Sequence, residues 1–223
     1  METDYLTIQA TGQHSLTIKK SRFITDIARV TTEDEAKAFL ATVSAREPKA
    51  NHHCWAYVIG EHDEIQRESD NGEPSGTAGV PILTVLQRNR LHNVIAVVTR
   101  YFGGIKLGAG GLIRAYSNAT STAIEAVGVV KRVRQREMTL AVDYANYDRL
   151  NHYLTEEKIA TLDTAYTDKV AVTIAVDLDA VAATQQAITN LLSDRLTVTL
   201  GDVIYNEVPV EINASSHQGT SES

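Results

Sequence analysis

The hydrophobic pattern of the first thirty residues is that of short strands. Apolar positions cluster or alternate over 5–10, 15–19 and 22–30, with a turn near Gly12. Such runs of β-branched and aromatic residues with a period of two are typical of strands. We therefore predict three strands at the start of the chain, the first two forming a hairpin.

A helix is expected next, from Thr32 onwards. Thr32 is followed three residues later by Glu35, which is the capping-box spacing, and Ala36, Phe39 and Val43 continue at helical intervals. Strands are then predicted at 53–60 and 64–69, and a further helix with Thr77 as its N-cap and Pro81 in its first turn.

The stretch 100–111, RYFGGIKLGAGG, joins a strong strand signal to a strong helix signal. Residues 92–99 form a nearly continuous β-branched run, as expected of a strand buried on both faces, and helical spacing runs from Leu107 to Gly128. The junction holds five of the thirteen glycines in the chain. Amides at a helix N-terminus suit an anion, with Arg100 and Lys106 as added charge. Close packing of the helix on the sheet would ask for the same glycines.

The second part of the chain reads as a regular βαββαβ order, which is the ferredoxin-like unit. Strands are expected at 137–144, 159–166, 170–178 and 196–209, and helices at 148–158 and 179–192. Between the two parts, 131–136 carries four cations and reads as a basic linker or edge strand, or as an extension of a phosphate-binding surface. This predicts an N-terminal domain over 1–130, a linker at 131–136, a C-terminal domain over 137–212 and a disordered tail over 213–223.

Charge changes this picture by limiting how nucleic acid could be bound. The net charge is −7, and residues 1–130 hold 13 Lys/Arg and 14 Asp/Glu, whereas the remainder is strongly acidic. A broad basic footprint is therefore excluded, and any such binding needs a local patch on the first part. The single Cys54, and a sequence with no leader pattern or apolar run of membrane-spanning length, predict a cytoplasmic protein without a disulfide and without a membrane partner.

Three groups of residues are candidates for chemistry. His52 and Cys54 fall on one strand face and His53 on the other, which is too few ligands for zinc, so we expect structural roles, no metal and no cofactor. Asp70 and Glu73 lie in a turn-rich stretch, where they would be acids, bases or magnesium ligands, or would cap nearby amides. That stretch contains Asp70, Asn71, Gly72, Glu73, Pro74, Gly76 and Thr77. We expect it to meet the glycine-rich stretch in space, because both precede helices that leave the same sheet.

Together these two stretches resemble the YigZ/IMPACT family, whose pattern D-[DN]-G-E-P-x-G-T-A-G-x-P is matched at 70–81 and whose R-Y-[FY]-G-G-[IV]-x-L-G-x-G-G-L is matched at 100–112. The resemblance implies an α+β protein. Its first domain would have a mixed or antiparallel sheet with helices on one face, similar to the fourth domain of elongation factor G, and its second would be ferredoxin-like. It also implies regulation of translation in the eukaryotic relatives and an inferred nucleic-acid or ribosome partner in the bacterial ones.

Two functions follow as expectations. The first is a non-catalytic, translation-associated factor that binds RNA, the ribosome or a translation-related protein. The second is an enzyme or binder of a phosphorylated small molecule or nucleotide, although no complete triad, Walker pattern or metal signature accompanies the glycines. In either case the expected anion or nucleic-acid site is formed by Arg100, Tyr101, Phe102, Gly103, Gly104, Lys106, Gly108, Gly110, Gly111 and Arg114.

Overall fold

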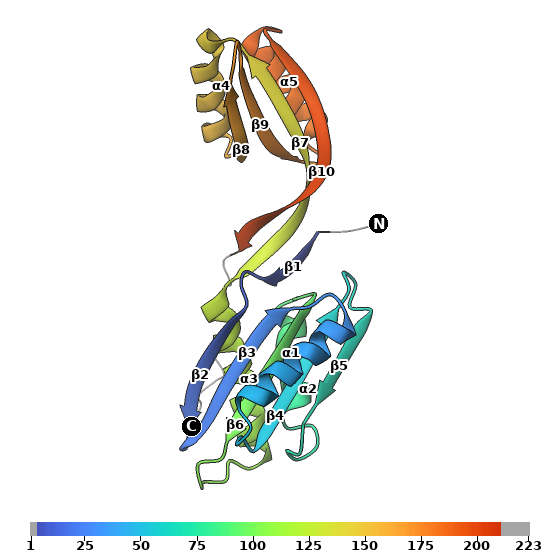
Figure 1. The fold of residues 1–223 in the computed structure, drawn as a ribbon, viewed down its shortest axis with the longest axis vertical. Coiled ribbons are helices and arrows are strands. Elements are labelled where there is room, and N and C mark those ends of the chain that lie inside the picture. Colours follow the sequence, from blue (N-terminus) through green and yellow to red (C-terminus); the bar gives the residue numbers. More distant parts are fainter. Residues whose placement is uncertain (1–3, 211–223) are drawn as a thin grey trace, which may run out of the picture. The chain divides into compact units, whose positions relative to one another are not determined.

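The computed structural model describes residues 4–210, which form two compact units. The first unit comprises the chain up to Lys131 together with residues 208–210, and the second comprises Arg132–Glu207. Strand β7 (Val129–Val142) carries the chain from the first unit into the second, and strand β10 (Leu196–Val210) brings it back. Figure 1 shows both units. The predicted tail over 213–223 lies outside the described residues.

The first unit is built on a five-stranded antiparallel sheet in the order β2-β3-β6-β4-β5. Its strands are β2 (Gly12–Ile18), β3 (Ser21–Arg29), β4 (His52–Ile59), β5 (Ile65–Ser69) and β6 (Val94–Tyr101). β6 lies at the centre, and residues 94–100 are all buried, because helices cover both faces of the sheet there. Strand β1 (Tyr5–Ile8) pairs instead with β7.

Three helices cover this sheet, and they do not all lie on one face (Figure 1). Helices α2 (Gly79–Arg88) and α3 (Ala109–Val127) pack on one face with Cys54, Ala56 and Val58 of β4. Helix α1 (Glu33–Arg46) packs on the opposite face with Tyr57 and Ile59. The α+β class is confirmed, but the expectation of helices on one face is wrong for α1.

Topology explains why the position of α1 is hard to foresee. The connections β3–α1–β4 and β5–α2–β6 are crossovers, because each joins two strands that run parallel. The two crossovers lead in opposite directions across the sheet. They also start from strands of opposite orientation. Two crossovers of the usual right hand would therefore place α1 and α2 on the same face. Since the helices lie on opposite faces, the two crossovers have opposite hands.

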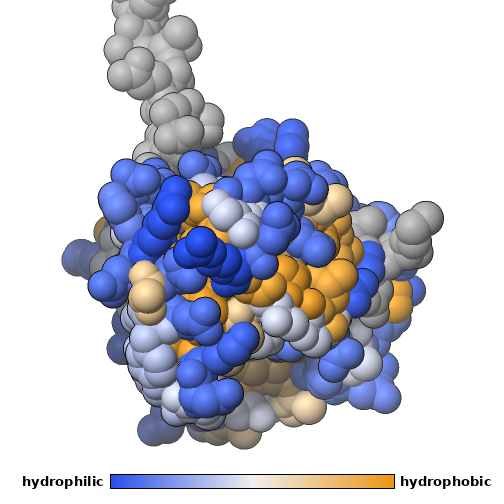
Figure 2. Space-filling view, turned by 90° about the horizontal axis from the view of Figure 1, so that it is seen from above, coloured by the Kyte–Doolittle hydropathy of each residue, from blue (hydrophilic) through white to orange (hydrophobic). Residues whose placement is uncertain are grey.

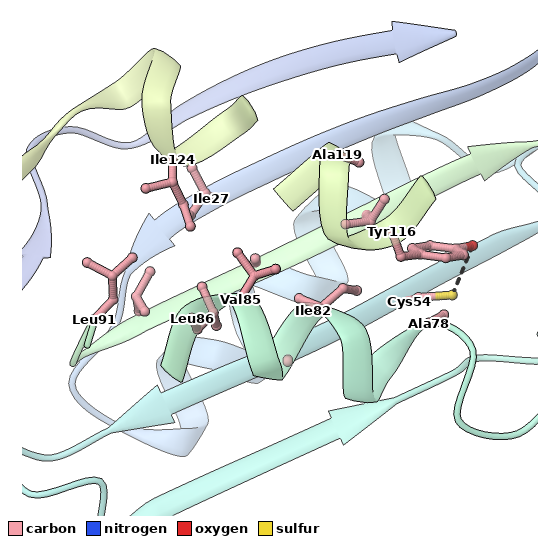
Figure 3. Close-up of a cluster of buried hydrophobic side chains, with 14 of the residues drawn as sticks. Ile27, Cys54, Ala78, Ile82, Val85, Leu86, Leu91, Tyr116, Ala119 and Ile124 are labelled. Atoms are coloured by element: carbon pink, nitrogen blue, oxygen red, sulfur yellow. Dashed lines mark hydrogen bonds between the residues drawn. The ribbon is translucent and has the colours of Figure 1, made fainter. Parts of the chain in front are cut away.

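The larger core of the first unit lies between the sheet and the α2–α3 pair (Figure 3). Ile82, Val85 and Leu86 of α2 face Tyr116 and Ile124 of α3, all close to fully buried. Buried apolar area of this kind stabilises a fold by about 25 cal/mol per Å². The core therefore holds the starts of α2 and α3 in fixed positions at one end of the sheet.

Of the two N-caps predicted from sequence, the one for α1 is present and the one for α2 is not. Thr32 caps α1 as predicted, and its hydroxyl accepts from the Glu35 amide at 3.2 Å. Thr77 was predicted to cap α2, but the N-cap is Ala78 without a side-chain cap, and Thr77 Oγ1 donates to the carbonyl of Pro74 instead. The cap of α2 comes from a residue farther away, as described below.

The second unit has the predicted βαββαβ order. After β7 come α4 (Tyr144–Glu156), β8 (Thr161–Tyr166), β9 (Val170–Asp177), α5 (Val181–Leu192) and β10. Its sheet has the order β8-β9-β7-β10, and the two helices bury Leu150 and Ile188 against Met138, Leu140 and Ile174. Figure 2 shows the molecule from above, relative to the view of Figure 1. On that side, hydrophobic side chains are exposed among hydrophilic ones.

The basic run 131–136 is part of β7 rather than a separate linker. Val133 is buried, Arg136 Nη1 donates to the carbonyl of Gly201 at 2.9 Å, and the Arg132 guanidinium lies 4.7 Å from the centre of the Tyr205 ring. These contacts arise because the run pairs with neighbouring strands, so its three arginines are only partly exposed. Among the described helices, none is long and apolar enough to cross a membrane.

Candidate functional site

The turn-rich stretch and the glycine-rich stretch meet in the first unit, as the sequence predicted. Glu73 Oε1 accepts from Arg100 Nη1 at 2.5 Å and from the Tyr116 hydroxyl at 2.8 Å. Glu73 comes from the turn before α2, Arg100 from the end of β6 and Tyr116 from α3. One carboxylate thus joins three elements at the end of the sheet.

Arg100 lies inside the protein rather than on its surface. It is 5% exposed, and its guanidinium carbon lies 5.4 Å from the ring centre of Phe23 and 5.6 Å from that of Phe102. Its Nη2 donates to Ser21 Oγ at 3.3 Å, while its Nε has no hydrogen-bond partner among the described residues. A buried donor left without a partner costs about 1–3 kcal/mol. The position therefore offers an unsatisfied N–H next to a charge that Glu73 already balances.

Cys54 and Tyr116 extend this buried polar chain into the core. Cys54 Sγ lies 3.3 Å from the Tyr116 hydroxyl, the contact dashed in Figure 3, and 3.0 Å from the carbonyl oxygen of Asp70. Burial raises the pKa of the Cys54 thiol to about 12, and burial together with the neighbouring Cys54 raises the pKa of Tyr116 far above its usual range. Both groups therefore stay neutral, and neither is an activated nucleophile.

His52 lies beside this cluster, with one ring nitrogen fixed and the other facing Glu73. His52 Nδ1 is 2.9 Å from the carbonyl oxygen of Asn71, so Nδ1 carries the proton and donates it. Its Nε2 lies 3.9 Å from Glu73 Oε1, which already accepts from Arg100 and Tyr116. His52 thus adjoins the carboxylate that joins the three elements.

The predicted alternation along β4 is present in the structure. Cys54 packs in the core beneath α2 and α3, whereas Trp55 packs on the α1 side of the sheet. His53 Nδ1 is 3.0 Å from Thr99 Oγ1, and burial lowers the pKa of His53. Within residues 4–210, no group of three or more His, Cys, Asp or Glu side chains is placed to hold a metal ion.

Asp70 supplies the missing cap of α2. Its Oδ1 accepts from the amides of Ala78 and Gly79 at 2.8 and 2.9 Å, and its Oδ2 accepts from the Gly76 amide at 2.8 Å. Burial alone would raise the pKa of Asp70, but the amides of Gly76, Gly79 and Ala78 outweigh it and hold that pKa below its usual range. Of the roles open from sequence, the structure gives Asp70 the capping one.

The remaining residues of this turn shape the backbone. The Asn71 side chain accepts from the His53 amide at 2.8 Å, which ties the turn to β4. Asn71, Gly72 and Gly76 have φ of 41°, 86° and 74°, and this left-handed region favours Gly and tolerates Asn. Glu73, held by this backbone, points at Arg100.

The loop between β6 and α3 holds its aromatic residues in two different ways. The Tyr101 hydroxyl donates to Glu47 at 2.6 Å, so Tyr101 is fixed against the end of α1, whereas Phe102 is 47% exposed. Asn51 Oδ1 accepts from the Phe102 amide at 2.8 Å. Gly103 is required by close approach, since a Cβ there would lie 2.0 Å from the backbone carbon of Lys20. Phe102 is therefore the aromatic face that the loop presents.

Helix α3 begins without a side-chain cap. Its N-cap is Gly108 at φ 71°, its first turn holds no acidic residue, and the amide of Leu112 donates to the Gly108 carbonyl at 2.9 Å. The amides before Leu112 have no acceptor within the helix. A Cβ at Gly110 would meet nothing within 4 Å, so the first turn of α3 is unobstructed at that position. This is the arrangement that binds anions at helix N-termini.

A pocket of about 450 Å³ opens beside this helix start. It is lined by Asn51, His52, Glu73, Pro74, Arg100, Phe102, Lys106, Leu107, Gly108, Ala109 and Leu112. Six of the predicted residues therefore share one cavity: Arg100, Phe102, Lys106 and Gly108 of the glycine-rich stretch, and Glu73 and Pro74 of the turn. Tyr101, Gly103, Gly104 and Gly110 are not among its lining residues.

A second cavity of about 500 Å³ shares Leu107 with the pocket, and two cationic side chains, Lys19 and Arg114, are among its lining residues. With Lys20 and Lys106 these form what we call the cationic rim: four exposed side chains, none with an ion pair among the described residues. Lys19 and Lys20 occupy the β2–β3 turn, with φ of 45° and 65°. Sequence reasoning did not assign these two lysines to the site. The β2–β3 turn brings them there, because it adjoins Ser21, which contacts Arg100 and Gly103.

Fold and site define a two-unit α+β protein whose first unit carries an uncapped helix start, a pocket and a cationic rim. The Impact N-terminal domain model matches residues 19–124, and a second model, a domain of unknown function called DUF1949, matches residues 140–195. The chain therefore belongs to the IMPACT family.

Individual relatives agree with this assignment over most of the chain. The chain is 42% identical to "IMPACT family member YvyE" of Bacillus subtilis over 206 residues, covering 92% of this chain and 95% of that protein. It is 44% identical to "IMPACT family member YigZ" of Escherichia coli over 129 residues, covering 57% and 63%. A solved structure titled "Crystal structure of an hypothetical protein" matches with a TM-score of 0.57 at 32% identity, covering 89% of this chain and 97% of that one.

Proposed function

We propose that this protein is a non-catalytic, translation-associated factor that binds RNA through its first unit. The observation that carries the proposal is the cationic rim around the uncapped start of α3. The β2–β3 turn contributes Lys19 and Lys20, the loop before α3 contributes Lys106, and α3 itself contributes Arg114. Unpaired cations gathered in this way on an acidic chain provide the local patch that phosphate binding needs.

The chemistry of the rim fits a single-stranded nucleic acid. Lys19, Lys20 and Arg114 would neutralise backbone phosphates, and the exposed ring of Phe102 would stack on a base. Stacking of this kind contributes about 1–3 kcal/mol per base. The family resemblance, with a first domain similar to the fourth domain of elongation factor G, favours ribosomal or transfer RNA as the source of this strand.

The polar groups next to the pocket favour binding over catalysis. Asp70 is occupied as a helix cap, and Glu73 is balanced by Arg100. Cys54 and Tyr116 are buried and neutral. A general acid or base needs a group that is free to exchange protons with a substrate, and these four are engaged within the protein.

The proposal is tested by binding of labelled single-stranded RNA and of purified ribosomes to charge variants. Lys19→Ala/Lys20→Ala should weaken RNA binding, each lost phosphate contact costing a few-fold in affinity at moderate salt. The matched control is Lys37→Ala/Arg88→Ala, which removes the same charge from exposed positions on α1 and the end of α2. If the two double variants bind RNA equally, the cationic rim is not an RNA-binding surface.

A phosphorylated small molecule is the second candidate, because the pocket volume of about 450 Å³ lies in the range of small-ligand sites. Lys106 in its lining favours an anionic ligand. Calorimetric titration with nucleoside mono-, di- and triphosphates tests this candidate. Binding that Lys106→Ala abolishes, in a protein that does not bind RNA, would replace the first proposal with the second.

A further inference from the structure

The second cavity, which we call the β2–α3 cavity, combines apolar walls with polar groups. Its lining residues come from the end of β2, the loop before α3 and α3 itself: Ile18, Lys19, Leu107, Gly111, Arg114, Ala115, Ser117 and Asn118. Ile18 and Leu107 pack against the larger core of the first unit, so these two walls are held in place. A volume of about 500 Å³ and a mainly apolar surface with a few polar groups are typical of small-ligand sites.

Helix α3 turns one side towards this cavity and presents a free amide there. Four of the lining residues follow one another at the spacing i, i+3, i+4 and i+7, namely Gly111, Arg114, Ala115 and Asn118. This spacing places them on one side of the helix. The Asn118 carbonyl accepts from Thr122 Oγ1 at 2.9 Å, whereas the Asn118 side-chain amide has no hydrogen-bond partner among the described residues. An amide offers a donor and an acceptor side by side, as pairing with the edge of a heterocycle requires.

Two elements bring cations to the cavity. Arg114 comes from α3 and Lys19 from the β2–β3 turn, and neither has an ion pair among the described residues. Lys19 and Lys20, the two residues of this turn, have φ of 45° and 65°, a conformation in which hairpins favour Asn and Gly. Lysine at both positions, against the preference of the backbone, indicates a use for the charge. A nucleotide in the cavity would therefore have a cation available on either side.

We propose that the β2–α3 cavity binds one unstacked base of the single-stranded RNA, and that this base is adenine. This rests on the proposed function and adds to it the part of the RNA that is read. Ile18 and Leu107 would contact the faces of the base, while Lys19 and Arg114 would contact the flanking phosphates.

Adenine is the base that this cavity fits best. The Asn118 amide can accept from the N6 amino group and donate to an adjacent ring nitrogen, and adenine presents this pair on two of its edges. Adenine also has no carbonyl oxygen that would lose its water among apolar walls.

The experiment compares four short RNAs: one of uridine throughout, and three with a central adenine, guanine or cytosine. At one salt concentration, the adenine RNA should bind about fivefold or more tightly than the uridine RNA, as expected for a bidentate contact to a base. Equal affinity for all four would overturn the base site and leave the proposed function standing. Absence of binding to any of them would contradict both.

Asn118→Ala is the informative variant, because it removes the amide without changing charge. The preference for adenine should fall towards one, while the affinity for the uridine RNA and its salt dependence stay as in the parent protein. Alanine is the better helix residue, and thermal unfolding confirms that the variant is folded.

The matched control is Asn151→Ala on α4. Asn151 is likewise an exposed helical asparagine, and its carbonyl accepts from Thr155 Oγ1 at 2.8 Å, the same i, i+4 contact. This control should keep the preference for adenine. If Asn118→Ala keeps it too, or if the parent prefers guanine and loses that preference in Arg114→Ala, the assignment of adenine to Asn118 is wrong.

Discussion

Asp70 caps helix α2 from outside the usual capping position. The N-cap residue itself, Ala78, has no side chain that can accept a hydrogen bond, so the orphan amides at the start of α2 depend on Asp70. Because its carboxylate also holds the Gly76 amide, this one residue fixes both the turn and the helix start. The position of Glu73 in the pocket wall follows from that turn.

We expect Asp70→Asn to destabilise the protein by about 1–3 kcal/mol at pH 7, since an amide keeps one acceptor oxygen and turns an NH₂ towards backbone N–H groups. Urea unfolding of both proteins measures this difference. The matched control is Asp34→Asn, where the side chain is 95% exposed, and a change within about 0.5 kcal/mol is expected.

The same variant tests the charge of Asp70 through pH. The folded state holds the pKa of Asp70 below its usual range, so this stability is present above the unfolded pKa of about 4 and is lost as pH falls through the folded pKa. The difference between wild type and Asp70→Asn should therefore shrink in acid. A difference that is the same at pH 7 and pH 3 would show that the carboxylate charge is not the cause.

Arg100 marks the limit of what the sequence predicts at this scale. The motif placed Arg100 at the site, where we expected it to add positive charge to the start of the helix. Because side chains alternate along a strand, Arg100 lies on the same face as Ala96 and Val98, which face α2 and α3. Its side chain therefore enters the core and pairs with Glu73. Alternation predicts the face of the sheet, but the partner of Arg100 depends on tertiary structure.

Glycines at the starts of α2 and α3 serve different purposes. A Cβ at Gly79 would lie 2.8 Å from the backbone nitrogen of Ser69 and 2.0 Å from Glu68 Oε2, so α2 needs Gly79 to approach β5. Gly110 has open space around it. The sequence left packing and anion binding open for glycines of the α3 junction, and the structure supports packing at Gly103 but not at Gly110.

Alanine variants of these two glycines should therefore change stability in opposite directions. Gly79→Ala should destabilise by about 1–3 kcal/mol, because the backbone of Ser69 cannot move away freely. Gly110→Ala should leave stability unchanged or raise it by up to about 1 kcal/mol, since alanine is the better helix residue. Urea unfolding of the two variants decides this. Equal losses in both would mean that Gly110 also packs against the protein.

The elements themselves were largely predictable, because periodicity depends on local burial. The strand at β6 and the long helix α3 follow directly from the run at 92–99 and the helical spacing after Leu107. The face taken by α1 was not predictable, because it depends on crossover handedness, which no residue pattern encodes. Lys19 and Lys20 were not assigned to the site for a similar reason, since the β2–β3 pairing brings their turn to the loop before α3.

At the scale of the whole molecule, the negative net charge restricts RNA binding to a local cationic patch. The chain has a net charge of −7, and the basic run 131–136 is engaged within β7 and its neighbours, so the cationic rim supplies the free positive charge that we assign to binding. The salt dependence of affinity counts the phosphates that a protein neutralises.

For a single strand that contacts all four rim cations, a plot of log K against log salt should have a slope of about −3, because each contact contributes about −0.7. Lys106→Ala should make the slope shallower by about 0.7, whereas Arg136→Ala should leave it unchanged, since Arg136 donates to Gly201 within the second unit. The slope should also stop growing once the RNA is long enough to span the rim. A slope that continues to steepen with RNA length, or that Arg136→Ala reduces as much as Lys106→Ala does, would extend the binding surface to β7.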